Sequence, residues 1–408
     1  MQQYLQRYAA NETRLLQNWP ISFERAMLIP AKNETPSMIE NCRSFCSRQG
    51  NTLLVLVINQ GDNQEDRTEN KQLWNSAIKS GPSCWQQGNL QLLQWPNQSG
   101  LLLIDRFSQG LSIPHKEGVG LARKIAADII VHLIANGKII SPWIYSSDAD
   151  CRWPANYFDT DALNQREDNK NKIVAAHFAF EHTACVDESI DSETRQAISQ
   201  ATKIYEQGLH YYQQGLAWAE SPYAFYTIGS CLAFHFKAYC EVRGFPARAA
   251  GEDFYLLNKL AKLGGIAFLN QQTIEIESRL SQRAPFGTGP AVSDIIGNGI
   301  QLCDYVSYHP MCFFKIKELM QAPSKILSTD LDPTIEVALQ SLGLAKFLRH
   351  LKQQNVGPDK FDSEFHTWFD GFRSLKFIHY LRDHHYPSIP LPQGIAQLQD
   401  WKASVTEK

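Results

Sequence analysis

The chain has 408 residues, of which 43% are hydrophobic and 20% are charged, and its formal net charge is -3 at pH 7. This length allows one large α/β domain with additions, or two domains. The composition predicts a packed core and excludes a disordered chain. The small net charge gives no general attraction to nucleic acid or to an anionic membrane surface, so we expect any basic site to be local.

The nine cysteines are an odd number and lack the paired spacing of a zinc site. We interpret them as reduced thiols. The N-terminal residues are polar and lack the apolar segment of a signal peptide, and no run has the length of a transmembrane helix. We therefore expect a cytoplasmic protein, with peripheral attachment at the inner membrane left open. The oligomeric state is not indicated.

Apolar runs alternate with helical patterns through the first 150 residues. A peripheral helix is expected in residues 1–24, and further helices at 37–48, 70–80 and 120–135. Strands are expected at 26–29, stopped by Pro30, and at 52–59, 90–95, 101–106 and 142–147. This alternation predicts a mostly parallel sheet with helices on its faces.

The second part of the chain mixes strands with longer helices. We expect a short helix at 153–158, a strand at 172–180, and helices at 191–214 and 251–263. Two short strands at 266–269 and 273–276 precede a Gly/Pro-rich loop at 284–290, and the chain reads as helical from about residue 311. The expected domains are a peripheral helix (1–24), an α/β domain (25–300) and a helical C-terminal region (301–408).

Two aspartates follow the strand at 142–147. Asp148 and Asp150 are two residues apart, so both can project from the strand end into the crevice at the carboxyl edge of the sheet. Two close carboxylates favour a hard divalent cation, and Mg²⁺ typically uses one or two carboxylates together with substrate phosphates. The plain alternative is a solvated turn at the end of a strand.

Four short elements occur in a recognisable order. They are Pro30-Ala31-Lys32-Asn33-Glu34 after the first strand, Gly118-Val119-Gly120-Leu121-Ala122-Arg123 at a helix start, Asp148-Ala149-Asp150, and Gly251-Glu252-Asp253-Phe254 at a second helix start. Together they resemble the family 2 glycosyltransferases, over about residues 24–290. The resemblance implies a GT-A fold, which is Rossmann-like with a mostly parallel central sheet flanked by helices, here with a helical C-terminal extension. It also implies a nucleotide-diphospho-sugar donor, Mg²⁺ or Mn²⁺, and a hydroxyl acceptor that is a glycan, a lipid-linked molecule or a small molecule.

The resemblance assigns the donor side to several residues. It places Asp150 as the better metal ligand and Asp148 near the ribose or the metal. Arg123 lies at the position that is near the nucleotide in the family, although a surface arginine is the alternative. The segment after residue 278 can offer guanidinium groups and backbone N–H groups to a diphosphate or an anionic acceptor, unless it is only a structural turn. The remaining expected nucleotide or diphosphate contacts are Pro30, Ala31, Asn33, Glu34, Arg279, Arg283, Gly287 and Thr288.

The acceptor side is assigned to Glu252 and Asp253. An inverting transfer needs one general base to take the proton of the acceptor hydroxyl, and a helix N-terminus helps to keep such a carboxylate ionised. Asp253 is the expected base, with Glu252 as second choice or acceptor contact. Ordinary helix capping is the alternative for both.

Three other classes of protein are alternatives to a glycosyltransferase. A haloacid-dehalogenase phosphatase places its Asp-x-Asp after the first strand, whereas here about five strands precede it. A sugar-phosphate nucleotidyltransferase needs a Gly-rich basic loop after the first strand, which residues 30–34 do not provide. A catalytically silent, glycosyltransferase-like nucleotide-sugar-binding or scaffold protein stays open, although Asp148, Asp150 and Asp253 are all present.

Overall fold

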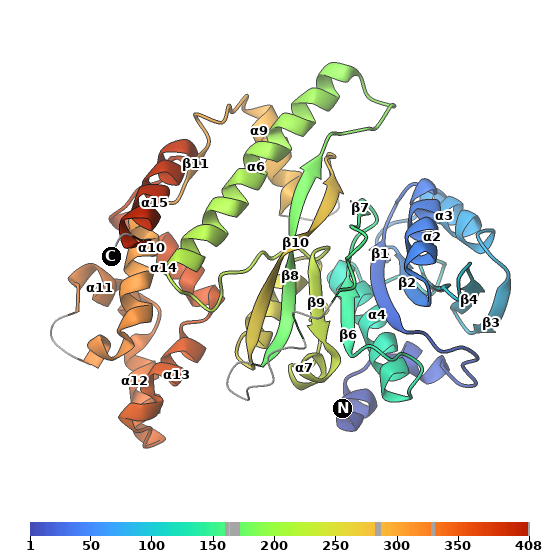
Figure 1. The fold of residues 1–408 in the computed structure, drawn as a ribbon, viewed down its shortest axis with the longest axis horizontal. Helices are drawn as coiled ribbons and strands as arrows, with labels where there is room; N and C mark the ends of the chain where they lie inside the picture. The colour runs from blue at the N-terminus through green and yellow to red at the C-terminus, as the bar shows by residue number, and fades with distance from the viewer. Residues whose placement is uncertain (160–162, 164–171, 282–286, 328–330, 407–408) are drawn as a thin grey trace. The chain divides into compact units, whose positions relative to one another are not determined.

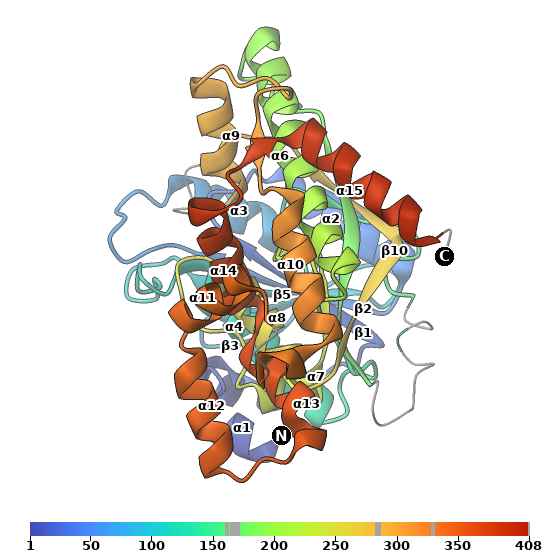
Figure 2. The same cartoon turned by 90° about the vertical axis from the view of Figure 1, so that its left-hand side faces the viewer.

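The computed structural model describes residues 1–159, 163, 172–281, 287–327 and 331–406. Two compact units divide the chain, and each contains two separate segments. The first unit combines Met1–Ala184 with Thr227–Gly287, and the second combines Cys185–Tyr226 with Thr288–Lys408. Figures 1 and 2 show the elements of both units in two views. The expected boundaries near residues 24 and 300 stay a prediction.

A ten-stranded sheet is the frame of the first unit, within the described residues. Its order is β3-β4-β5-β2-β1-β6-β9-β8-β10-β7. The strand bounds are Ser83–Gln87 (β3), Leu90–Gln94 (β4), Gly100–Arg106 (β5), Thr52–Asn59 (β2), Arg25–Ala31 (β1), Trp143–Ser146 (β6), Leu232–His235 (β9), Ile173–Thr183 (β8), Gly265–Glu277 (β10) and Cys151–Arg152 (β7). The pairings make β3, β5, β2, β1, β6, β8 and β10 run in one direction, and β4, β9 and β7 run against them. The expected α/β class with a mostly parallel central sheet is therefore confirmed.

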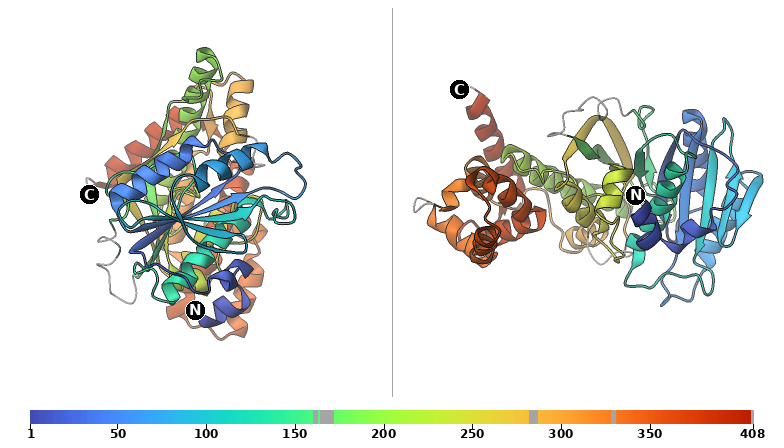
Figure 3. Two further views of the ribbon diagram at one scale, coloured as in Figure 1. Left: turned by 90° about the vertical axis from the view of Figure 1, so that its right-hand side faces the viewer. Right: turned by 90° about the horizontal axis from the view of Figure 1, so that it is seen from below.

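Helices cover both faces of this sheet. All eight residues of β2 are buried, as expected for a continuous apolar strand between two helical layers. Right-handed crossovers put α2 (Ser37–Gln49) and α4 (Gly118–Ala135) on opposite faces, because α2 joins β1 to β2 and α4 joins β5 to β6 in the opposite direction (Figure 3). The other helices of the unit are α1 (Gln2–Arg7), η1 (Asn11–Leu15), α3 (Thr68–Ile78), α7 (Phe236–Glu241) and α8 (Glu252–Leu260).

Several local expectations for the first unit were wrong. The N-terminal segment forms two short helices, α1 and η1, in place of one. Strand β1 continues through Pro30, which a strand tolerates there because β6 pairs with β1 only as far as Leu28. The two short strands at 266–276 are one strand, β10, with an irregularity between Leu269 and Thr273. Residues 155–158 form a turn, and β3, β7 and β9 were not foreseen.

The second unit is helical, so the expected helical C-terminal region is present. Its helices are α6 (Ser192–Trp218), α9 (Thr288–Gly297), α10 (Pro310–Gln321), η2 (Pro323–Leu327), α11 (Pro333–Ser341), α12 (Leu344–Gln353), α13 (Pro358–Trp368), α14 (Gly371–His384) and α15 (Leu391–Thr406), with a small pair of strands, β11 (Val306–Ser307) and β12 (Ile389–Pro390). Its core combines buried leucines and isoleucines with phenylalanines such as Phe313, Phe365 and Phe377.

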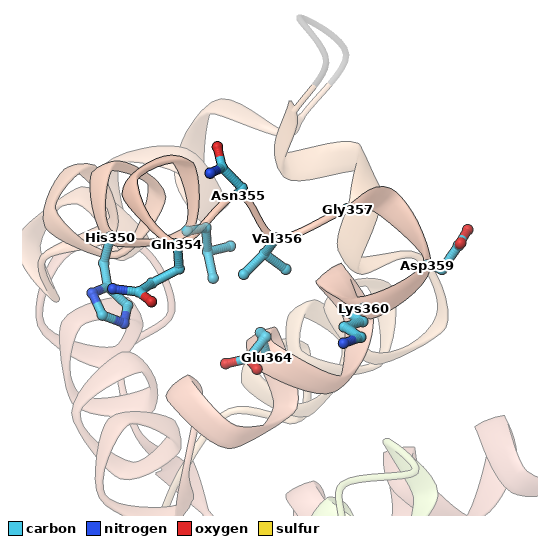
Figure 4. A pocket seen from close by; sticks show the side chains of 9 residues that line it. His350, Gln354, Asn355, Val356, Gly357, Asp359, Lys360 and Glu364 are labelled. Atoms are coloured by element: carbon cyan, nitrogen blue, oxygen red, sulfur yellow. The ribbon is translucent and has the colours of Figure 1, made fainter.

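A cavity of about 630 Å³ lies in the second unit, beside α12 and α13 (Figure 4). Its lining includes His350, Gln354, Lys360 and Glu364, and no residue singled out from the sequence lines it. Across the described parts of both units, no helix is both long enough and apolar enough to cross a membrane.

Candidate active site

The candidate site lies where parallel strands of the first unit end. Strands β1, β6 and β10 run in the same direction, so their carboxyl ends share one edge of the sheet. Glu34 follows β1, Asp148 follows β6, and Arg279 follows β10. Sheet topology therefore brings together residues that are more than a hundred positions apart in the chain.

Arg123 of α4 is the centre of a buried cluster. Its Nη2 donates to Oδ1 of Asp148 at 2.7 Å, and its Nε donates to Oε1 of Glu252 at 2.8 Å. Its Nη1 donates to Oγ of Ser146 at 2.9 Å and to the carbonyl of Ser147 at 3.1 Å. Arg123 thus joins the end of β6 to the first turn of α8.

The electrostatics of this cluster hold Arg123 in its charged form. The arginine side chain is only 3% exposed. Burial by itself would lower the pKa of Arg123, but Asp148 and Glu252 outweigh burial and raise that pKa above its ordinary value. Buried charges are tolerated when they are paired and hydrogen-bonded, and here three nitrogen atoms of one guanidinium group meet four acceptors.

Asp150 contacts a second arginine, Arg279, which follows strand β10. Strand β7 pairs antiparallel with the end of β10, and the Glu277 N–H donates to the Asp150 carbonyl at 3.0 Å. This pairing places Nη2 of Arg279 2.7 Å from Oδ2 of Asp150. The same guanidinium donates to both carboxylate oxygens of Glu34, at 2.7 and 3.1 Å. Arg279 therefore links the loop after β1 to the second aspartate, and those two carboxylates raise its pKa against the opposing effect of burial.

Asp253 lies beside Glu252 in the first turn of α8, after Gly251 in the left-handed conformation with φ of 73°. Its Oδ1 accepts the N–H of Phe254 at 2.7 Å. Burial, followed by repulsion from Glu252, raises the pKa of Asp253 to about 7. A carboxylate that changes charge near neutral pH can accept a proton from a substrate.

The Gly-Val-Gly segment at the start of α4 allows a close backbone approach to the loop before α8. The N–H of Gly120 donates to the Arg248 carbonyl at 3.0 Å. A Cβ added at Gly120 would lie 2.4 Å from the Pro246 carbonyl oxygen and 2.7 Å from backbone atoms of Arg248. This contact holds the α4 start and the α8 start together, which supports the Arg123–Glu252 pair.

Replacing Gly120 by alanine should therefore destabilise the first unit by roughly 1–3 kcal/mol, the usual cost of overpacking. Thermal denaturation would measure this as a lower Tm. Gly297→Ala is the matched control, because a Cβ at Gly297 meets nothing within 4 Å. Equal Tm values for Gly120→Ala and the wild type would contradict the close approach.

The two aspartates fit only one kind of metal site. Within residues 1–159, 163, 172–281, 287–327 and 331–406, no three His, Cys, Asp or Glu side chains are grouped to hold a metal ion by themselves. Carboxylate oxygens suit hard cations, and Mg²⁺ usually keeps several water or phosphate ligands. The donor set of Asp148 and Asp150 therefore fits a cation that completes its shell with substrate oxygens and water.

The remaining predicted site residues lie in several places. Pro30 and Ala31 end β1, and the Ala31 carbonyl accepts from the Asn59 side chain at 3.1 Å. Asn33 has a positive φ, and its N–H donates to Oδ1 of Asn70 at 2.9 Å. Gly287 ends the first unit with φ of 102°, and Thr288 begins α9 of the second. Arg283 lies outside the described residues.

Two contributors to the site were missed from the sequence. Ser146 is fully buried, accepts from Arg123 and donates to the Gly229 carbonyl at 2.7 Å. Gly229 leaves room for the guanidinium, because a Cβ there would lie 2.4 Å from Nη2 of Arg123. A serine inside an apolar strand next to the Asp-x-Asp was the available signal for Ser146, and Gly229 had none.

The fold and the site together define an α/β protein with paired carboxylates and arginines at the carboxyl edge of its sheet. No protein-family model matches the sequence, and no curated protein matches it. Glycosyltransferases are among the solved structures that the chain resembles. A mannosyltransferase from Pyrobaculum calidifontis in complex with GDP-Man and Mn²⁺ is 15% identical, with 94% of this chain and 95% of that chain covered and a TM-score of 0.34.

Two further structures resemble the chain at a similar level. Glucosyl-3-phosphoglycerate synthase from Mycobacterium tuberculosis in complex with phosphoglyceric acid is 13% identical, with 67% and 77% of the two chains covered and a TM-score of 0.34. GalNAc-T7 with UDP, GalNAc and Mn²⁺ is 12% identical, with 91% and 59% covered and a TM-score of 0.35.

Proposed function

We propose that the protein is a glycosyltransferase that moves a sugar from a nucleotide-diphospho-sugar to an acceptor hydroxyl, as family 2 enzymes do, with inversion at the anomeric carbon. One observation carries the proposal. Arg123 joins Asp148, which belongs to the candidate metal and diphosphate site, to Glu252, the neighbour of the candidate base Asp253. Arg123 thereby holds the proposed diphosphate site close to the carboxylate that is proposed to activate the acceptor hydroxyl.

The donor side uses the carboxyl edge of the sheet. Asp150 and Asp148 would hold Mg²⁺ or Mn²⁺, which when bound neutralises charge on the departing diphosphate. The loop residues Pro30, Ala31, Asn33 and Glu34 are the proposed contacts of the nucleoside. Arg279 and Arg283 can offer forked hydrogen bonds to phosphate oxygens, and Gly287 and Thr288 are proposed to complete the binding of the diphosphate.

The acceptor side uses Asp253. Its carboxylate takes the proton of the acceptor hydroxyl while the hydroxyl oxygen forms a bond to the anomeric carbon. The bond from that carbon to the phosphate oxygen breaks, and its electron pair leaves with the nucleoside diphosphate. A pKa of about 7 supports this role, because general bases work best when their pKa is near the working pH. Glu252 is held by Arg123, which favours Asp253 over Glu252 as the base.

Isothermal titration tests the donor side. UDP, GDP and dTDP, with and without Mn²⁺, should reveal one nucleoside diphosphate that binds the wild type only when the metal is present. Asp150→Asn should weaken this metal-dependent binding by about tenfold or more, since one carboxylate ligand is lost. Glu241→Gln, at an exposed carboxylate that ends α7, is the matched control. If none of the three binds the wild type with Mn²⁺, the proposed function fails.

Binding with no transfer would instead favour the catalytically silent alternative. Incubation of the bound nucleotide-sugar with a panel of hydroxyl acceptors separates the two. Hydrolysis or transfer that depends on Asp253 supports an enzyme, whereas tight binding without turnover supports a nucleotide-sugar-binding protein.

A further inference from the structure

Each of the two aspartates is paired with an arginine: Asp148 with Arg123, and Asp150 with Arg279. The two arginines differ in burial and in their hydrogen-bond partners. Arg123 is 3% exposed, and its Nε, Nη1 and Nη2 all donate to protein acceptors. Arg279 is 29% exposed, and its described acceptors are the carboxylates of Glu34 and Asp150. Arg123 is therefore a fixed part of the core, and Arg279 is accessible to an incoming anion.

The contacts of Arg279 are also unequal. Glu34 receives two hydrogen bonds, one on each carboxylate oxygen, which is the strong forked geometry. From Arg279, Asp150 receives a single contact, from Nη2 to Oδ2 at 2.7 Å. Glu34 can thus keep the arginine at the site while the contact with Asp150 is given up.

The contact with Asp150 opposes metal binding on the same carboxylate. A guanidinium on Oδ2 neutralises the charge that attracts a cation and occupies one of the two donor atoms. A diphosphate that arrives with its metal offers the guanidinium new anionic oxygens in the forked geometry that it prefers. Breaking the Arg279–Asp150 contact therefore costs little free energy when the metal and the diphosphate bind together. When the metal binds alone, the lost contact is not replaced.

We propose that Arg279 is an exchangeable counter-ion of the donor site, which pairs with Asp150 in the empty protein and turns to the diphosphate when the metal and nucleotide bind. This deepens the proposed function and rests on it, because Asp150 must be a metal ligand. The consequence is ordered recognition: the site has low affinity for free divalent cations and takes them up with a nucleoside diphosphate.

The test compares two affinities in Arg279→Met. Binding of Mn²⁺ alone, measured by electron paramagnetic resonance of the free ion, should tighten about five- to tenfold, because the Arg279 guanidinium no longer competes for Oδ2 of Asp150. Binding of the nucleoside diphosphate in the presence of Mn²⁺, measured by titration calorimetry, should weaken about tenfold or more, because the forked contact is lost. Opposite signs in one variant are the signature of the exchange.

Two further variants separate the exchange from other effects. Arg152→Met removes an exposed positive charge two residues from Asp150, so its affinity for Mn²⁺ alone should change by less than about twofold. Arg279→Lys keeps a charge but loses the fork, and it should weaken nucleotide binding without tightening Mn²⁺ binding. Circular dichroism and Tm confirm that each variant is folded.

The outcomes are distinguishable. Unchanged or weaker Mn²⁺ binding in folded Arg279→Met overturns the exchange, as does an equal gain in Arg152→Met. In either case the proposed function stands if the wild type binds a nucleoside diphosphate with Mn²⁺. Failure of the wild type to bind any nucleoside diphosphate overturns the proposed function itself.

Discussion

Asp253→Asn should lower the turnover number by about 10²–10⁴-fold, the usual contribution of a positioned general base. The amide keeps the shape of the side chain but cannot take the proton of the acceptor hydroxyl. Donor binding should stay within about threefold of the wild type, because the described contacts of Asp148 and Asp150 with their arginines do not involve Asp253. Steady-state kinetics with the donor identified by titration would measure both quantities, and Glu241→Gln serves again as the exposed control.

The pH dependence of the wild type follows from the same group. Since the pKa of Asp253 is raised to about 7, log kcat/KM should rise with pH below 7 and level off above it. At pH 5 almost all of the base is protonated and the rate should be low. A rate that is independent of pH between 5 and 8 would exclude Asp253 as the base, whatever the effect of Asp253→Asn on turnover.

Asp253→Asn should be more stable than the wild type at alkaline pH, although its turnover is lower. A raised pKa means that the folded protein holds a proton which the unfolded chain releases near its ordinary value of 3.8. Wild-type stability from this group is thus fully present below about pH 4 and is lost as the pH rises to 7. Asp253→Asn removes that loss, so at pH 8 its Tm should exceed that of the wild type, and near pH 4 the two should be equal.

Prediction from the sequence succeeded where a strand or helix is marked by the pattern of apolar residues within its own segment. The run at 52–59 is buried at every position, and the pattern at 37–48 became α2. The position of Asp148 at the carboxyl edge follows from the strand before it. By contrast, β7 has only two residues and pairs through Cys151 and Arg152, so no periodicity marks it. The Asp150–Arg279 contact depends on that pairing and could not be foreseen.

The N-terminal segment shows a second limit of local patterns. Asp128 reads as a polar residue on an amphipathic helix, yet it is fully buried. Its carboxylate accepts from the Tyr4 hydroxyl, the Ala10 N–H and the Lys124 ammonium. These bonds tie Tyr4 of α1 and Ala10, which lies between α1 and η1, to α4. The donors Tyr4 and Ala10 are more than a hundred residues from Asp128 in the chain. The local sequence around Asp128 therefore does not indicate these hydrogen bonds.

Arg123→Met should be the most destabilising single change at the site. Methionine approximates the length of the arginine stem but leaves Asp148 and the buried Glu252 without their cation. Breaking a buried ion pair by removing one partner typically costs about 3–5 kcal/mol, because the remaining charge stays desolvated. The free energy of unfolding in urea measures this loss. Arg25→Met, which removes an arginine that contacts Glu24 at an exposed pair, should cost less than about 1 kcal/mol.

A double variant identifies the cause of that loss. In Arg123→Met with Glu252→Gln, one of the two stranded charges is gone, so the double variant should be more stable than Arg123→Met by about 1–2 kcal/mol. If Arg123→Met were destabilised only by poorer packing, the second substitution would not restore stability. Restoration would instead show that Arg123 compensates the carboxylates of Asp148 and Glu252 at the place where the donor side and the acceptor side of the proposed reaction meet.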